Sequence, residues 1–170
     1  AISNKNYLNL LIGLFFLSVL IGTHETLGLY LVTFFWELTP YQIGFLFINN
    51  IIGYVLGFIL AARLHRSFDK RATIVFTCLC LSIFWSMAVT LRLFDLAPQN
   101  TTWELVVFII CFGAVSSASG SILNISVMSA LADVSDENEL KTGMRQEGIY
   151  YSASAFFGKA SNAFGHVVAG

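Results

Sequence analysis

Lys159 is the residue whose position has the clearest chemical consequence. It lies inside the last apolar stretch of the chain, eleven residues after Gly148. At about 1.5 Å per helical residue this is roughly 16 Å along a helix, near the middle of a hydrocarbon layer about 30 Å thick. A lysine at that depth costs about 2.5–3.5 kcal/mol on the most lenient scale, and its side chain of roughly 6 Å does not snorkel to water. We therefore expect Lys159 to line a polar cavity.

Three further ionisable residues in apolar stretches are candidates for the same cavity or for a proton site: His24, Glu25 and His166. A carboxylate buried without a partner takes up a proton, so Glu25 is a candidate proton site or a partner of Lys159. The alternative is that His24 and Glu25 face a wet vestibule on the outer side. His166 follows Lys159 by two helical turns on the same face, so it either lines the same cavity or is a hydrogen-bonded packing residue.

The composition requires a membrane environment. Of 170 residues, 56% are hydrophobic and 11% charged, against about 45–50% and about 25% in soluble domains. This excludes a disordered chain, a disulfide scaffold and a nucleic-acid-binding domain, and the net charge of -1 points to no strongly charged partner. Cys78, Cys80 and Cys111 lie in apolar surroundings, where the expected role is that of small buried hydrophobes.

Five apolar stretches are each long enough for a helix that crosses a bilayer, and none shows the alternation of a β-barrel strand. We expect an all-α membrane protein with helices at about 7–36, 43–62, 72–94, 105–132 and 149–170. The segments 63–71 and 133–148 are expected to be charged loops. Gly53 and Gly57 form a GxxxG pattern, and residues 116–121 are all small, so both segments are suited to close helix packing.

The basic residues are distributed unevenly between the two sides of the predicted membrane. The side opposite the N-terminus holds Arg92 alone, and Trp36, Tyr41 and Trp103 lie where an aromatic belt is expected on that side. The positive-inside rule therefore places the N-terminus in the cytoplasm. The N-terminal side holds Lys5, Arg63, Arg66, Lys70, Arg71, Lys141 and Arg145.

No phosphate-binding glycine loop, HExxH, CxxC pair or nucleophile elbow is present. We expect no enzymatic activity, no metal and no cofactor; a membrane enzyme would need a nucleophile and a base at matched depth, which only the surroundings of His24 and Glu25 offer. An odd helix count and an apolar end at Gly170 suggest a fragment that lacks at least one further helix. A natural five-helix protein is the alternative.

The segment before Lys159 resembles the signature of a known transporter family. It is similar to that of the glycoside–pentoside–hexuronide:cation symporters, the melibiose-permease-like branch of the major facilitator superfamily, which reads roughly A-D-x-x-D-x-x-E-x-K-T-G-x-R-x-E-G before an aromatic-rich helix with a lysine. The resemblance covers about forty residues, and the loop 63–71 is similar to a degenerate superfamily loop motif. The matching positions are Asp133, Asp136, Glu139, Lys141, Thr142, Gly143, Arg145, Glu147, Gly148 and Lys159.

The resemblance implies helices 7–11 of a twelve-helix transporter, with a missing N-terminal half as partner, in the inner cell membrane. It implies cation-coupled symport, driven by sodium or a proton, of a small polar solute such as a sugar or glycoside. Lys159 would line the cavity. The charged residues from Asp133 to Glu147 would form a cytoplasmic network that latches one state of the carrier.

One position departs from the melibiose-type pattern. Asn124 stands nine residues before Asp133, where those carriers tend to have an aromatic ring that stacks on sugar. Asn124 is therefore a candidate cavity residue. A carrier of an amphipathic lipid and a non-transporting membrane subunit remain as alternatives.

Overall fold

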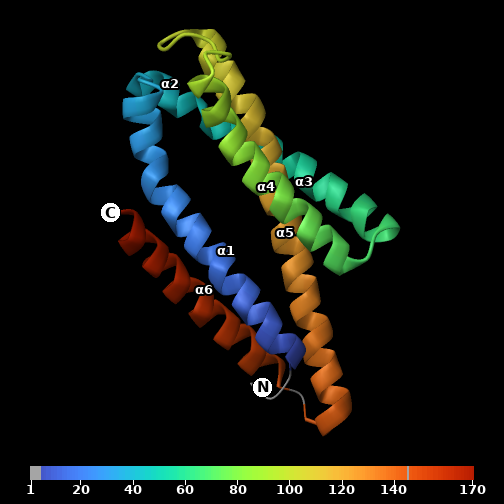
Figure 1. Ribbon diagram of the computed structural model, residues 1–170. Coiled ribbons are helices and arrows are strands. Elements are labelled where there is room, and N and C mark those ends of the chain that lie inside the picture. The colour runs from blue at the N-terminus through green and yellow to red at the C-terminus, as the bar shows by residue number, and fades with distance from the viewer. Residues whose placement is uncertain (1–4, 145) are drawn as a thin grey trace. The chain divides into compact units, whose positions relative to one another are not determined.

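The computed structural model describes residues 5–144 and 146–170, and every regular element in these ranges is helical (Figure 1). The first helix, α1 (Lys5–Tyr30), continues directly into a five-residue π-helix that ends at Phe35. The elements are α1 (Lys5–Tyr30), η1 (Leu31–Phe35), α2 (Pro40–Phe45), α3 (Phe47–Ser67), α4 (Lys70–Leu93), α5 (Trp103–Thr142) and α6 (Glu147–Ala169). The predicted all-α fold is confirmed.

Four stretches of the described chain are long and apolar enough to cross a membrane: Tyr7–Phe35, Pro40–Ser67, Lys70–Leu93 and Trp103–Thr142. The predicted fifth helix, α6, forms over 23 residues. It is less apolar than the other four because Lys159, Asn162 and His166 interrupt its hydrophobic residues. That α6 also crosses the membrane stays a prediction.

The chain divides into two compact units, which are described separately. The first contains Ala1–Leu31 and Met128–Gly170, and the second contains Val32–Val127. The long helix α5 contributes its C-terminal turns to the first unit and its N-terminal part to the second.

In the first unit, α1 and α6 pack side by side and run parallel. Tyr7 contacts Tyr150 near the start of both helices, and Thr26 contacts His166 near their ends. The Tyr7 hydroxyl donates to the Tyr150 carbonyl oxygen over 3.0 Å. These two tyrosines form a buried cluster with Leu11 and with Leu131 of α5. This cluster anchors the pair at the end where α6 begins.

In the second unit, small residues let α3 approach α5 closely. A Cβ on Gly53 would collide with the Ser117 side chain, and one on Gly57 would lie 2.7 Å from the Ala118 carbonyl oxygen. The GxxxG pattern of α3 thus packs on the small residues of α5, as their composition predicted. Helix α4 packs on α5 too, through the Phe84 and Phe112 rings.

The turn before α2 is held by a capping box. The Thr39 side chain accepts a hydrogen bond from the Gln42 amide, and the Gln42 side chain accepts one from the Thr39 amide. Gln42 also donates to the Thr101 carbonyl oxygen over 3.0 Å, which joins this turn to the one before α5. Tyr41 and Trp103 meet edge to face beside it. Both rings are exposed, as a membrane-interface belt requires.

Trp36 does not belong with these two rings. We predicted it for the aromatic belt, but it is only 4% exposed. Its ring packs against Phe35 and Phe108 inside the second unit. An indole buried among aromatic rings contributes packing rather than an interfacial contact.

Two segments that we predicted as loops are largely helical. α5 continues ten residues beyond Ala132, the expected end, to Thr142, and α3 reaches Ser67. Charged residues favour helix when they are spaced four apart and no glycine or proline intervenes. α5 ends only at Gly143, whose φ of +69° breaks the helix. The connection expected over 133–148 is therefore much shorter than predicted.

Candidate functional site

Lys159 lies on the side of α6 that faces away from α1. The buried positions of α6 are Tyr150, Ser154, Ser161 and Gly165. At about 100° per residue, Lys159 is roughly opposite the mean direction of these four. Its side chain is exposed and has no hydrogen-bond or ion-pair partner among the described residues.

An exposed aromatic residue lies near Lys159 on the open side of α6. Phe156 precedes Lys159 by three residues and lies about 60° from it around the helix, whereas Phe157 lies about 160° away. An ammonium near an exposed ring at mid-helix suits a ligand or partner that combines polar and apolar surface. The structure thus leaves the lysine open to a partner outside this part of the chain.

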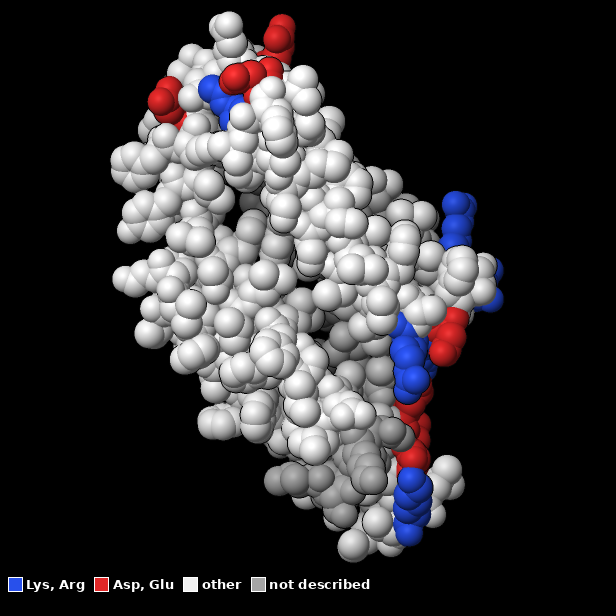
Figure 2. All heavy atoms as spheres, viewed as in Figure 1, with Lys and Arg blue, Asp and Glu red and all other residues white. Residues whose placement is uncertain are grey.

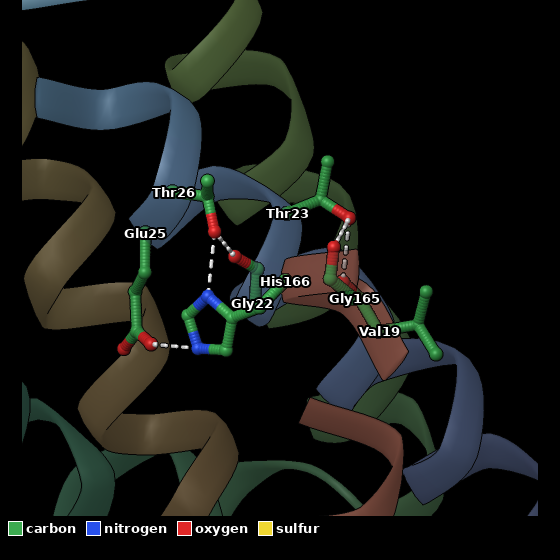
Figure 3. Close-up of polar contacts among 7 residues, drawn as sticks. All are labelled: Val19, Gly22, Thr23, Glu25, Thr26, Gly165 and His166. Atoms are coloured by element: carbon green, nitrogen blue, oxygen red, sulfur yellow. Dashed lines mark hydrogen bonds and ion pairs between the residues drawn. The ribbon is translucent and has the colours of Figure 1, made fainter. Parts of the chain in front are cut away.

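Glu25 and His166 meet near the far end of the α1–α6 pair (Figure 3). The Nε2 atom of His166 lies 3.6 Å from a carboxylate oxygen of Glu25, with side chains 45% and 56% exposed, respectively. The Nδ1 atom of the same ring lies 2.5 Å from the Thr26 hydroxyl oxygen. Both ring nitrogens are therefore in contact with α1. Glu25, for which Lys159 was one expected partner, pairs instead with His166.

Two glycines bring the backbones of α1 and α6 together just below this pair. A Cβ on Gly22 would collide with the Asn162 carbonyl oxygen, and one on Gly165 with the Val19 carbonyl oxygen. The Thr23 hydroxyl lies 2.9 Å from the Val19 carbonyl and 3.2 Å from that of Gly165. The close approach positions the side chain of the next residue, His166, over α1 (Figure 3).

His24, the neighbour of Glu25, is partly buried on α1 and makes a contact of its own. It lies about 100° from Glu25 around the helix, so it points to a different side from Glu25. The partner of Glu25 on another helix is His166 of α6, and the Glu25 side chain stays 56% exposed. That His24 and Glu25 face an outer vestibule stays a prediction.

Asn124 belongs to the second unit, on α5. Its side chain is exposed and has no hydrogen-bond partner among the described residues. Another amide joins helices there, because the Ser117 hydroxyl donates to Asn50 Oδ1 over 2.9 Å. Asn124 therefore remains open to a ligand or partner, as a cavity residue would be.

The charged residues expected to form a network lie mostly on the last turns of α5. Figure 2 shows acidic and basic side chains side by side along this end of the helix. Lys141 pairs with Glu137, one turn earlier, which the prediction did not include. Asp133 and Asp136 are exposed, Glu139 is partly so, and Glu147 begins α6. Arg145 lies outside the described residues.

Two contributing residues were missed in the sequence. Thr26 contacts His166. Its position one helical turn after Gly22 could have indicated that both residues lie on the same face of α1. Glu137 pairs with Lys141 at the i,i+4 spacing of helical ion pairs. The prediction did not include this pair because the segment was expected to be a loop.

A comparison with protein families identifies the kind of molecule to which these helices belong. The family model described as MFS/sugar transport protein matches residues 1–170. The chain belongs to this family. It is thus an integral membrane protein of the major facilitator superfamily and a transporter of the sugar type. No curated protein and no solved structure matches the chain.

Membership of the MFS/sugar transport family gives the open residues a context. Carriers of this architecture bind their solute near the middle of the bilayer between two helical halves. Lys159 lies near the middle of α6, on the side away from α1, and its contact with a solute stays a prediction. Transport is the activity general to the family.

Proposed function

We propose that this chain is the C-terminal half of a cation-coupled symporter that carries a small polar solute such as a sugar or glycoside. The observation that carries the proposal is the exposed ammonium of Lys159, without a partner among the described residues, in the middle of a helix of a transporter chain. In hydrocarbon such a charge is too costly without a cavity or a counter-ion. The melibiose-permease-like signature before Lys159 supports the same branch of the superfamily.

Lys159 has two possible roles in such a carrier. It donates hydrogen bonds to solute hydroxyl or anionic groups, or it balances a carboxylate of the N-terminal half. Both require the two halves to enclose the site and to rock about it, so that access alternates between the two sides. Sodium or a proton is the coupling cation.

A second solute class is supported by Asn124. The exposed amide stands where melibiose-type carriers tend to have a sugar-stacking ring, and the exposed ring of Phe156 near Lys159 offers apolar surface. An amphipathic lipid with a polar head would contact both kinds of group. Uptake assays with a panel of sugars and lysolipids distinguish these classes.

The proposed orientation places the N-terminus and the charged end of α5 in the cytoplasm of the inner cell membrane. The support is the distribution of basic residues, because positive side chains favour the cytoplasmic side. In this orientation the charged cluster, including the Lys141–Glu137 pair, lies where a cytoplasmic latch between helices would act.

The test is the Lys159→Ala variant of the complete transporter. We expect transport to fall at least tenfold while the protein stays inserted and its melting temperature in detergent changes little. Lys159→Arg should not restore full activity, because a planar guanidinium does not replace a compact ammonium at a shaped site. Lys70→Ala, at the start of α4 and outside the charged end of α5, is the control for the loss of a positive charge.

Two results would contradict the proposal. Transport by Lys159→Ala at the parent rate would show that the solute does not depend on the ammonium. A large loss of stability, about 3–5 kcal/mol, would instead identify Lys159 as half of a buried structural ion pair.

A further inference from the structure

We propose that Glu25 and His166 form a proton-binding site that joins α1 to α6. The geometry that carries the inference is the contact of both ring nitrogens of His166 with different groups on α1 (Figure 3). Nδ1 lies 2.5 Å from the Thr26 hydroxyl, and Nε2 lies 3.6 Å from the Glu25 carboxylate. The site itself requires no transport, whereas its use in coupling rests on the proposed function.

The hydrogen-bond directions determine where the protons are. The Thr26 hydroxyl carries one hydrogen, which it donates to the Gly22 carbonyl oxygen over 3.0 Å. With that hydrogen engaged, we assign the Thr26 oxygen as the acceptor and the Nδ1 atom of His166 as the donor in their contact. A neutral ring with its hydrogen on Nδ1 would turn the lone pair of Nε2 toward the carboxylate. One additional proton, held between Nε2 and Glu25, removes this repulsion.

Close backbone contacts between α1 and α6 hold the His166 ring beside Glu25 and Thr26. His166 follows Gly165, which touches the Val19 carbonyl, and Glu25 and Thr26 follow Gly22, which touches Asn162. The two helices therefore cannot separate at this level without breaking close backbone contacts. Protonation adds an ion pair to a contact that already exists.

Few other charged groups face the pair within the first unit. On α1 the titratable neighbours are His24 and, one turn beyond Glu25, Tyr30; on α6 the nearest is Lys159, two turns earlier. The acidic residues and Lys141 on the last turns of α5 lie toward the start of α6, near Leu131 and Tyr150. The proton is therefore bound mainly by Glu25 and His166.

The depth of the site gives it access to one side of the membrane. His166 is nineteen residues beyond Glu147, the first residue of α6. This corresponds to about 28 Å of helix, close to the full thickness of the hydrocarbon core. The half-exposed pair thus lies near the membrane surface opposite the start of α6, where protons from that side reach it.

The direct test is nuclear magnetic resonance of the chain in nanodiscs with ¹⁵N-labelled histidine. The chain has three histidines, so single substitutions assign each ring. We expect His166 to carry its hydrogen on Nδ1 throughout and to gain a second on Nε2 in one titration step. Glu25→Gln should displace that step by at least about half a pH unit, because the imidazolium loses its anionic partner, and should leave His65 unchanged.

Control variants separate this pair from general effects. Thr26→Ser keeps the hydroxyl and should preserve the Nδ1–H signal, whereas Thr26→Ala should alter it. His24→Gln should leave the titration step of His166 within about 0.3 pH units. A His166 ring with its hydrogen on Nε2 alone, or a titration unaffected by Glu25→Gln, would overturn the proton site.

Transport then tests the use of the site. In the complete carrier, we expect Glu25→Gln to reduce the change of the uptake rate with pH at least threefold. The solute affinity should stay that of the parent. Uptake that keeps its pH dependence would overturn a coupling role while leaving the proton site intact. A Lys159→Ala variant that remains fully active would contradict the proposed function without affecting the magnetic resonance result.

Discussion

Side chains with hydroxyl groups recur at the helix contacts of both units. In the second unit, Ser126 donates to the Ile122 carbonyl over 2.7 Å, and its hydroxyl oxygen also lies 3.1 Å from Nε2 of His65. The Ser117 hydroxyl instead donates its hydrogen bond to Asn50 Oδ1 on another helix. In a membrane, such bonds contribute to helix association because the hydrocarbon offers no competing water.

The Asn50–Ser117 bond should be measurable as a pairwise coupling. We expect a double-mutant cycle of Asn50→Ala and Ser117→Ala to give about 0.6 kcal/mol, with about 1.7 kcal/mol as the upper bound. Unfolding of the purified chain in detergent provides the measurement. Asn124→Ala, which removes an amide without a described partner, should change the unfolding free energy by less than about 0.5 kcal/mol. A coupling of zero would show that the two side chains act independently.

The helices themselves follow from the apolar stretches of the sequence, and all five predicted stretches are helical. The ends of these helices are predicted less accurately from the sequence, because charge alone does not distinguish an exposed helix from a loop. Asp133 to Lys141 illustrates this, as the residues that suggested a loop extend α5. Only Gly143, with its positive φ, ends the helix.

The candidate site was predictable only in part. Lys159 was predicted from its own helix alone, because depth depends on spacing along one element, and its role stays a prediction. The pairing of Glu25 with His166 depends on the contact between α1 and α6, which are distant in the sequence. Hydrophobicity does not specify which helices meet in a membrane, since lipid tails are as apolar as side chains.

The α1–α6 contact should depend on Gly22. Gly22→Ala would place a methyl group against the Asn162 carbonyl, and we expect a loss of about 1–3 kcal/mol of unfolding free energy. Gly13→Ala is the matched control on the same helix, because nothing lies within 4 Å of its added Cβ. That variant should be neutral or stabilising by up to about 1 kcal/mol. Equal effects of the two variants would argue against a close contact at Gly22.

The orientation of the chain in the membrane is testable by labelling with an impermeant thiol reagent. In a background without Cys78, Cys80 and Cys111, we expect Gln99→Cys to react from outside intact cells. Ser67→Cys, at the end of α3, should react only after permeabilisation, because its basic neighbours favour the cytoplasm. External labelling of Ser67→Cys would reverse the proposed orientation.

The charged end of α5 should affect the balance between carrier states. An exposed i,i+4 ion pair contributes only about 0.3–0.5 kcal/mol to a helix, so Lys141→Gln should leave stability nearly unchanged. If the cluster acts as a latch, the same variant should lower the transport rate several-fold with little change in solute affinity. Glu137→Gln should reproduce the effect, and Lys70→Gln, at the start of α4, is the control. Unchanged rates in both cluster variants would identify a merely solvated segment.

The parallel contact between α1 and α6 also affects how the protein is made. Thr26 and His166 are separated by 140 residues, which take roughly 7–28 s to synthesise at about 5–20 residues per second. Throughout that time α1 is present in the bilayer with its glycine face uncovered, while α3, α4 and α5 are made and inserted before α6. During this interval α1 is open to wrong partners, so a membrane chaperone that shields Gly22 would act before α6 emerges.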